Sequence, residues 1–127
     1  CRRCSAASSR NVSRTCGNSM SAKKSSIFDS VPAVFPGEWV ERIAGKKGVR
    51  IERIVSRGHA SPEGFWFDQA ETEWVFVAKG AARVRFEEND TVVEMHPGDH
   101  LIIPSRVRHR VDWTTPDEDT IWVAVFY

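Results

Sequence analysis

Glycine and proline interrupt this chain at short intervals from about residue 30 onward, and this punctuation limits what the chain can fold into. The segments between them are short and rich in Val, Ile, Phe and Trp, and no long stretch repeats its apolar residues with the period of a helix. The pattern predicts strands at residues 49–56, 73–79, 81–87, 91–95, 100–103, 109–113 and 120–127. Residues 38–43 are predicted to form a further strand or a short helical turn. Many short strands joined by turns indicate an all-β sandwich or barrel.

Length and hydropathy restrict the chain to one domain that does not span a membrane. The chain has 127 residues, and a domain commonly takes roughly 100 to 200. No apolar run approaches the roughly 18 residues that a membrane-spanning helix needs. We therefore expect a single folded unit and no membrane partner.

Residues 1–26 differ in composition from the rest. They hold six of the 18 basic residues, all three cysteines, and no acidic or aromatic residue. Such a segment cannot bury enough apolar surface to offset the entropy of ordering, so we predict a disordered basic leader at 1–26 and one folded domain at 27–127. The leader has the composition of an organelle transit peptide, but an overextended start, with Met20 as the true first residue, is the other interpretation. The domain contains no cysteine, which fits the cytoplasm as the expected location unless the leader directs import.

The charge of the predicted domain argues against nucleic-acid binding. Residues 27–127 contain twelve basic and seventeen acidic side chains, so the domain is net negative. Arg106, Arg108 and Arg110 form a basic stripe that could bind an acidic group, but it is too short for a nucleic-acid surface. The favoured interpretation is a solvated outer face whose arginines pair with carboxylates.

Strand alternation places two ionisable side chains inside the domain. Successive residues of a strand point to opposite faces, so Glu73 shares a face with Val75, and His109 shares one with Val111. A buried carboxylate needs a partner, because an unpaired charge is costly to remove from water. Glu73 and His109 are therefore the first candidates for a functional site.

The spacing of turn and polar residues resembles the two motifs of the cupin superfamily of small β-barrels. Glu73 is followed after six residues by Gly80, as at the end of the first motif, and Gly98, Pro104 and His109 match the second motif in identity and spacing. The resemblance covers about residues 38–127 and implies a cupin-type double-stranded β-helix, or jelly-roll barrel. It also implies a homodimer formed through a strand or a sheet face.

The chain departs from the family at the expected metal ligands. The paired histidines of the first motif would fall within residues 66–69, where this chain has none. Of the four ligands that the family offers a divalent metal, Glu73 and His109 keep their identities. The chain thus resembles small single-domain cupins (the cupin 2 type) with a divergent first motif, a branch that we associate with no settled activity.

Two interpretations of Glu73 and His109 stay open. By resemblance they would hold a divalent transition metal (Fe, Mn, Ni or Zn), with Asp68 or Gln69 as a third ligand and His59 as a more distant candidate. Two strong ligands are fewer than the usual three, however, and a glutamine carbonyl is a weak, neutral donor. Glu73 and His109 could instead form a hydrogen-bonded ion pair in a metal-free barrel.

Two functional hypotheses follow. The first is a metal-dependent enzyme acting on a small organic molecule, in which the ion polarises a carbonyl or activates oxygen or water. The second is a metal-free module with a decayed metal site that binds a small ligand or serves as a scaffold. A barrel of this size encloses just enough space for one small ligand. Whether the protein is an enzyme is left open by the sequence.

Overall fold

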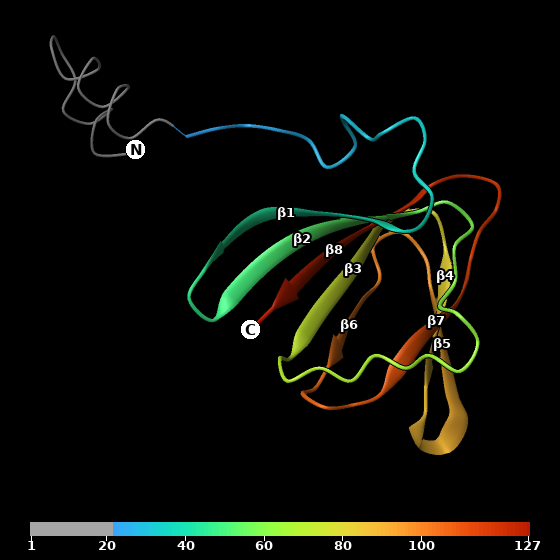
Figure 1. The fold of residues 1–127 in the computed structure, drawn as a ribbon. Coiled ribbons are helices and arrows are strands. Elements are labelled where there is room, and N and C mark those ends of the chain that lie inside the picture. The colour runs from blue at the N-terminus through green and yellow to red at the C-terminus, as the bar shows by residue number, and fades with distance from the viewer. Residues whose placement is uncertain (1–21) are drawn as a thin grey trace, which may run out of the picture.

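The computed structural model describes residues 22–127, whose strands form two antiparallel sheets (Figure 1). The larger sheet has the strand order β1-β2-β8-β3-β6, and the smaller has the order β5-β4-β7. The strands are β1 (Trp39–Lys46), β2 (Val49–Ser56), β3 (Glu73–Lys79), β4 (Ala82–Phe86), β5 (Thr91–Met95), β6 (His100–Ile103), β7 (His109–Thr114) and β8 (Thr120–Phe126), with a 3-10 turn η1 (Glu88–Asp90) before β5. Within the described part, no helix is long and apolar enough to cross a membrane. The predicted all-β class is confirmed.

The strand positions agree closely with the pattern of turns and alternation. Strands β2, β3, β5 and β6 have the predicted bounds; β7 and β8 differ by one residue at one end, and β4 is one residue shorter at each end. Residues 39–46 form a strand, so the strand interpretation of this region is correct and the helical turn is wrong. The leader predicted at 1–26 lies outside the described residues except for 22–26.

The core lies between the two sheets and consists of the inward face of each. In β4, Val84 is 2% exposed while its neighbour Arg83 points to solvent, as alternation predicts. The buried apolar cluster comprises Val75, Val77, Ala82, Val84, Met95, Ile103, Trp122, Ala124 and Phe126. These side chains hold the two sheets face to face.

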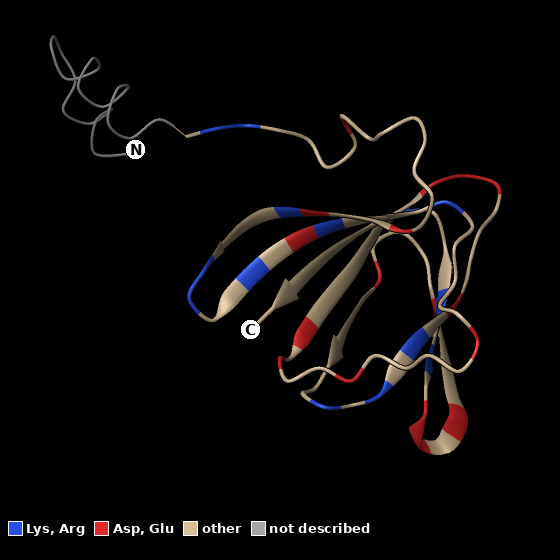
Figure 2. Ribbon diagram, in the orientation of Figure 1, with Lys and Arg blue, Asp and Glu red and all other residues tan. Residues whose placement is uncertain are grey.

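Strand β8 is apolar on both faces because it lies in the middle of the larger sheet. It pairs with β2 along one edge and with β3 along the other. Figure 2 shows that β8 carries no charged residue, whereas the adjacent β2 alternates between both signs of charge. A central position in the sheet therefore accounts for this apolar run.

The segment before β1 covers part of the outer face of β2, and a buried arginine holds it there. Arg53 is 3% exposed, and its Nη1 donates to the carbonyls of Ile27 at 2.9 Å and Asp29 at 2.5 Å. Its guanidinium also lies 4.9 Å from the centre of the Trp39 ring. Figure 1 shows this segment running above β1 and β2 in this view before it turns down into β1. The opposite face of β2 is therefore the one that faces the interior of the domain.

The arginine stripe is an outer face paired with carboxylates, as the favoured interpretation predicted. Each of its three guanidiniums lies within 4 Å of a carboxylate oxygen. The pairs are Arg106 with Asp68 at 3.3 Å, Arg108 with Glu87 at 3.2 Å and Arg110 with Asp112 at 2.9 Å. The pairs of Arg106 and Arg108 are exposed and contribute little to stability, whereas the pair of Arg110 is partly buried. The stripe is thus accounted for without a bound anion.

Gly80, in the turn between β3 and β4, occupies a position that tolerates no side chain. It has φ +88°, and a Cβ there would lie 2.6 Å from Thr120 Cα and 2.9 Å from the Asp119 carbonyl oxygen. We predict that Gly80→Ala lowers the free energy of unfolding by about 3 kcal/mol, because backbone strain and a clash add together. Gly48 is the matched control, since it has φ +82° but no atom within 4 Å of the position that a Cβ would take. Gly48→Ala should cost about 1 kcal/mol in the same urea titration; equal losses would contradict the clash.

The expected homodimer stays a prediction. An apolar strip on the outside of the larger sheet is the surface at which we expect the two copies to meet. Cross-strand pairing aligns Ile102 with Trp74, Trp74 with Val125, and Val125 with Ile51. Ile102 is 56% exposed at the edge of this strip. We expect light scattering after size exclusion to report a dimer, and Ile102→Arg to convert it to a monomer. Val92→Arg, an exposed position on the smaller sheet, should leave the dimer intact; dissociation by both variants, or by neither, would contradict this interface.

Candidate functional site

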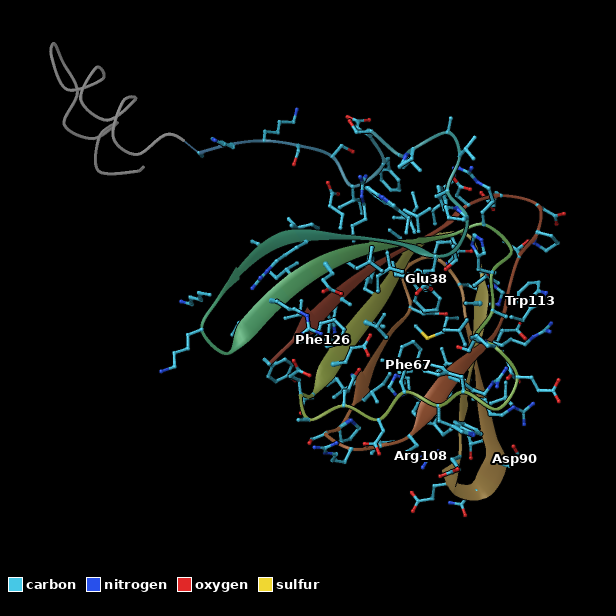
Figure 3. All side chains as sticks on the ribbon, in the orientation of Figure 1. Glu38, Phe67, Asp90, Arg108, Trp113 and Phe126 are labelled. Carbon is cyan, nitrogen blue, oxygen red and sulfur yellow. The ribbon has the colours of Figure 1, made fainter. Side chains whose placement is uncertain are left out.

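A cavity of about 310 Å³ lies between the two sheets. Its volume is at the lower end of the range for small-molecule sites. Figure 3 shows Glu38, Phe67 and Phe126 around the space between the sheets. The cavity is lined by Glu38, Val40, Arg50, Glu52, Ile54, Phe67, Gln69, Glu73, Val75, Val84, Ile103, His109, Val111, Trp122 and Phe126. Most of this wall is apolar, and the few polar side chains therefore determine what can bind.

Three of the polar side chains form one cluster, which we call the Gln69–Glu73–His109 cluster. Gln69 Nε2 donates to Glu73 Oε1 at 3.0 Å, and His109 Nε2 lies 3.5 Å from the same oxygen. The side chains of Glu73 and His109 are only 10% and 5% exposed. The structure thus confirms the inward placement of both residues and brings Gln69 to them. The buried Glu73 carboxylate thus has the partner that its burial requires, in the Gln69 amide, and His109 Nε2 is a second partner when the ring is protonated.

The ring of His109 is held in one orientation by its surroundings. Nδ1 lies 2.9 Å from the carbonyl oxygen of Val107, and because a carbonyl can only accept, Nδ1 carries a hydrogen. The ring stacks on Phe67, with centroids 5.3 Å apart and planes inclined at 23°. Nε2 is consequently the nitrogen presented to Glu73 and the cavity. It can carry a second proton in an ion pair or contact a bound molecule.

The connection between β2 and β3 supplies two side chains next to this cluster, Phe67 and Gln69. Phe67 N donates to the His109 carbonyl at 2.7 Å, and His109 N donates to the Phe67 carbonyl at 3.2 Å. Two residues further along, the Gln69 carbonyl accepts from Arg106 N at 2.8 Å. A piece of extended chain therefore pairs with the start of β7. Because side chains alternate along it, Phe67 and Gln69 line the cavity and Asp68 points away.

Asp68, the other predicted third ligand, is not brought to the cluster. Its side chain is 44% exposed and lies 3.3 Å from Arg106 Nη1 on the outside of the domain. His59 is also elsewhere, where its Nδ1 accepts from the backbone N of Arg57 at 2.9 Å and its ring packs on Phe35. The structure thus unites Glu73, His109 and Gln69 from the predicted set and leaves Asp68 and His59 outside.

Sequence reasoning did not identify three further charged residues of the cavity wall. Arg50 and Glu52 lie on the inward face of β2 and pair with each other at 2.9 Å, and Arg50 also pairs with Glu71. Glu38 precedes β1, and its Oε2 accepts from Ser56 Oγ at 3.1 Å. The alternation of β2 could have indicated that Arg50 and Glu52 share a face. Alternation alone, however, does not say which of the two faces of a strand points inward.

Burial changes the acidity of Glu38. The residue as a whole is exposed, but its carboxylate lines the cavity and accepts a hydrogen bond from Ser56, which is fully buried. Desolvation raises the pKa of Glu38 above its ordinary value; the hydrogen bond from Ser56 and the nearby His59 oppose this rise, and the negative charge of Glu73 adds to it. Keeping this carboxylate charged in the folded protein therefore carries a cost.

The side chains present do not make a complete protein metal site. Within residues 22–127, no group of three or more His, Cys, Asp or Glu side chains is placed to hold a metal ion. Gln69 is the third member of the cluster, and it turns its amide nitrogen, a donor, toward Glu73. A catalytic metal usually has three protein ligands, and here two are in place. The predicted metal, of whatever kind, is not supported by this donor set.

Comparison with known proteins decides the family. The family description "Cupin domain" matches residues 54–126, which is more than half of the chain and includes both Glu73 and His109. The chain belongs to the cupin family. A search of the curated proteins finds no match.

Solved structures agree with this cupin assignment. A protein of Ralstonia eutropha JMP134, named a "putative mannose-6-phosphate isomerase", is 43% identical, with a TM-score of 0.79 over 83% of this chain and 97% of that one. An RmlC-like cupin from Shewanella frigidimarina NCIMB 400 is 15% identical, with a TM-score of 0.60 over 76% and 81% of the two chains. A cupin-2 domain containing protein of the same strain is 17% identical, with a TM-score of 0.57 over 72% and 82%. The two Shewanella proteins support the fold alone.

Replacement of Glu38 is expected to stabilise this cupin in a pH-dependent way. A raised pKa means that Glu38 contributes stability below its unfolded pKa, and that this contribution is lost as pH rises through its folded pKa. Glu38→Gln should therefore melt at a higher temperature than the wild type at about pH 7, and the difference should disappear at about pH 3.5, where both side chains are neutral. Glu118→Gln, at an exposed position, is the control. A lower melting temperature for Glu38→Gln at neutral pH would contradict the assigned burial.

Proposed function

We propose that this cupin binds a small organic molecule in the cavity between its sheets, with the Gln69–Glu73–His109 cluster contacting a polar group of that molecule. The observation that carries the proposal is the placement of a buried, hydrogen-bonded polar cluster in the wall of an otherwise apolar cavity. Small-molecule sites have this composition: apolar walls supply affinity, and a few fixed polar groups supply orientation. The cluster is also held in place, because the backbone hydrogen bonds between Phe67 and His109 join the segment that carries Gln69 to the strand that carries His109.

The chemistry available to the cluster is hydrogen bonding and proton exchange. Glu73 can accept a hydrogen bond, and His109 Nε2 can donate or accept one according to its protonation. Gln69 constrains the Glu73 carboxylate through its amide. A ligand hydroxyl or amine placed against Glu73 and His109 would therefore be oriented by both, which is the first requirement for any catalysis at this position.

The similarity to the Ralstonia protein supports a small polar ligand. The charges of the cavity wall, however, argue against a phosphorylated ligand. Among the described residues that line the cavity, Arg50 is the only arginine or lysine, and it is engaged by Glu52 and Glu71. A phosphate group entering the cavity would meet the carboxylates of Glu38, Glu52 and Glu73 without a free guanidinium to balance them. The cavity thus favours a neutral or cationic molecule.

Fragment binding tests the proposed function. We expect that some small polar fragments shift the NMR signals of the Trp122 indole N–H and of the Phe67 and His109 amides. Ile54→Trp, which fills the cavity from its wall, should abolish this binding. Ile43→Trp is the matched control, because Ile43 is 45% exposed on β1. Fragments that bind Ile54→Trp as well as the wild type would place the binding site elsewhere.

A metal-dependent enzyme is the second candidate, favoured by the orientation of His109. A histidine that donates its Nδ1 hydrogen to a backbone carbonyl presents Nε2 in the way typical of metal ligands. Elemental analysis after reconstitution with Fe, Mn, Ni and Zn separates the two candidates. We expect less than about one tenth of an equivalent per chain, because two ligands bind weakly. A full equivalent that His109→Ala removes and His59→Ala retains would establish the metalloprotein instead.

A further inference from the structure

A second polar group, separate from the Gln69–Glu73–His109 cluster, reaches the cavity from the other end of the fold. Glu38 stands immediately before β1, whereas the cluster belongs to the connection before β3 and to the starts of β3 and β7. Figure 3 shows Glu38 near the upper end of the space between the sheets and Phe67, which stacks on His109, toward the lower end. One molecule inside the cavity could therefore meet polar groups at two ends.

A short relay of hydrogen bonds holds the carboxylate of Glu38. Trp122 Nε1 donates to Ser56 Oγ at 3.2 Å, and Ser56 Oγ donates to Glu38 Oε2 at 3.1 Å. The indole can only donate and a hydroxyl has one hydrogen, so the Ser56 hydrogen is committed to Glu38. Within residues 22–127 no donor reaches Oε1. The carboxylate is thus positioned by one oxygen, and its other oxygen has an unused capacity to accept.

The charges around the cavity favour a cation at this position. Three of the lining side chains are carboxylates, and the one guanidinium, on Arg50, is held by Glu52 and Glu71 and lies 4.0 Å from the centre of the Phe126 ring. The groups that act on Glu38 are Ser56 and His59, which favour its charged form, and Glu73, which disfavours it. Desolvation is the largest effect and raises the pKa of Glu38. A ligand cation would offset the cost of desolvation and the repulsion by Glu73, because a nearby opposite charge favours the charged carboxylate.

We propose that Glu38 is a specificity-determining residue that binds an ammonium group, so that the ligand of the cavity is a small organic amine. Oε1 of Glu38 accepts a hydrogen bond from the ammonium group, and the aromatic side chains of Phe67 and Trp122 pack against the ligand's apolar part. The Gln69–Glu73–His109 cluster contacts the other end. This inference rests on the proposed function, because it needs a molecule in the cavity.

Three probes that differ in one group test the assignment: benzylamine, benzyl alcohol and benzoate. Each has the same ring and nearly the same size, and they carry a cation, a neutral hydroxyl and an anion at about neutral pH. Binding is followed by NMR titration of the Trp122 indole N–H in the wild type. We expect benzylamine to bind at least about tenfold more tightly than benzyl alcohol, and benzoate to bind more weakly than both.

The variant Glu38→Gln tests which carboxylate is responsible. We expect it to weaken benzylamine about tenfold and to leave benzyl alcohol within about twofold of the wild type. Glu118→Gln removes the same charge from the surface and should change neither affinity. A circular dichroism melt of each variant checks that it is folded.

The outcomes separate this inference from the proposed function. If benzyl alcohol binds in the cavity and benzylamine binds no better, or if Glu38→Gln leaves benzylamine binding unchanged, the role of Glu38 is overturned while small-molecule binding stands. If Glu73→Gln weakens benzylamine and Glu38→Gln does not, the ammonium group belongs to the cluster and the assignment to Glu38 is wrong. If none of the three probes shifts the Trp122 signal, the proposed function fails as well.

Discussion

The backbone pairing of Phe67 with His109 is the interaction on which the site depends. His109 begins a strand of the smaller sheet, while Glu73 begins a strand of the larger one, so nothing within either sheet sets their separation. The chain between β2 and β3 crosses this gap and pairs with the start of β7 through two hydrogen bonds. That pairing fixes the alternation of the crossing segment, which places Gln69 beside Glu73. The cluster is therefore a consequence of joining two sheets at one edge.

The cavity exists because the core fills only part of the space between the sheets. Val77, Ala82 and Met95, each no more than 1% exposed, pack closely in one part of the interior. Elsewhere two of the inward residues of β2, Arg50 and Glu52, are charged, and charged side chains cannot close a cavity as apolar ones do. The segment held by Arg53 covers the outer face of β2, while the face that carries Arg50 and Glu52 lines the cavity. One part of the interior is thus closely packed and apolar, and another part contains a cavity with charged side chains in its wall.

Much of the fold could be predicted from the sequence because strands in a two-sheet protein leave a local signal. Alternation in β3 and β7 placed Glu73 and His109 inside, and the structure agrees. The choice between Asp68 and Gln69 could not be made, since it depends on the pairing of a loop with a distant strand. Glu38 was not found for a similar reason: its position in the cavity depends on how the segment before β1 packs over β2. Local patterns specify faces, and long-range contacts decide which face is inside.

The most direct test of this account is the state of the His109 ring, measured by nitrogen-15 NMR of its side chain. If the cluster is arranged as described, the neutral ring carries its hydrogen on Nδ1, donated to the Val107 carbonyl, and leaves Nε2 facing the cavity. Small molecules that enter the cavity should then shift the Nε2 signal and leave Nδ1 almost unchanged. A neutral ring protonated on Nε2 instead would contradict the account, because the nitrogen assigned to ligand contact would be the wrong one.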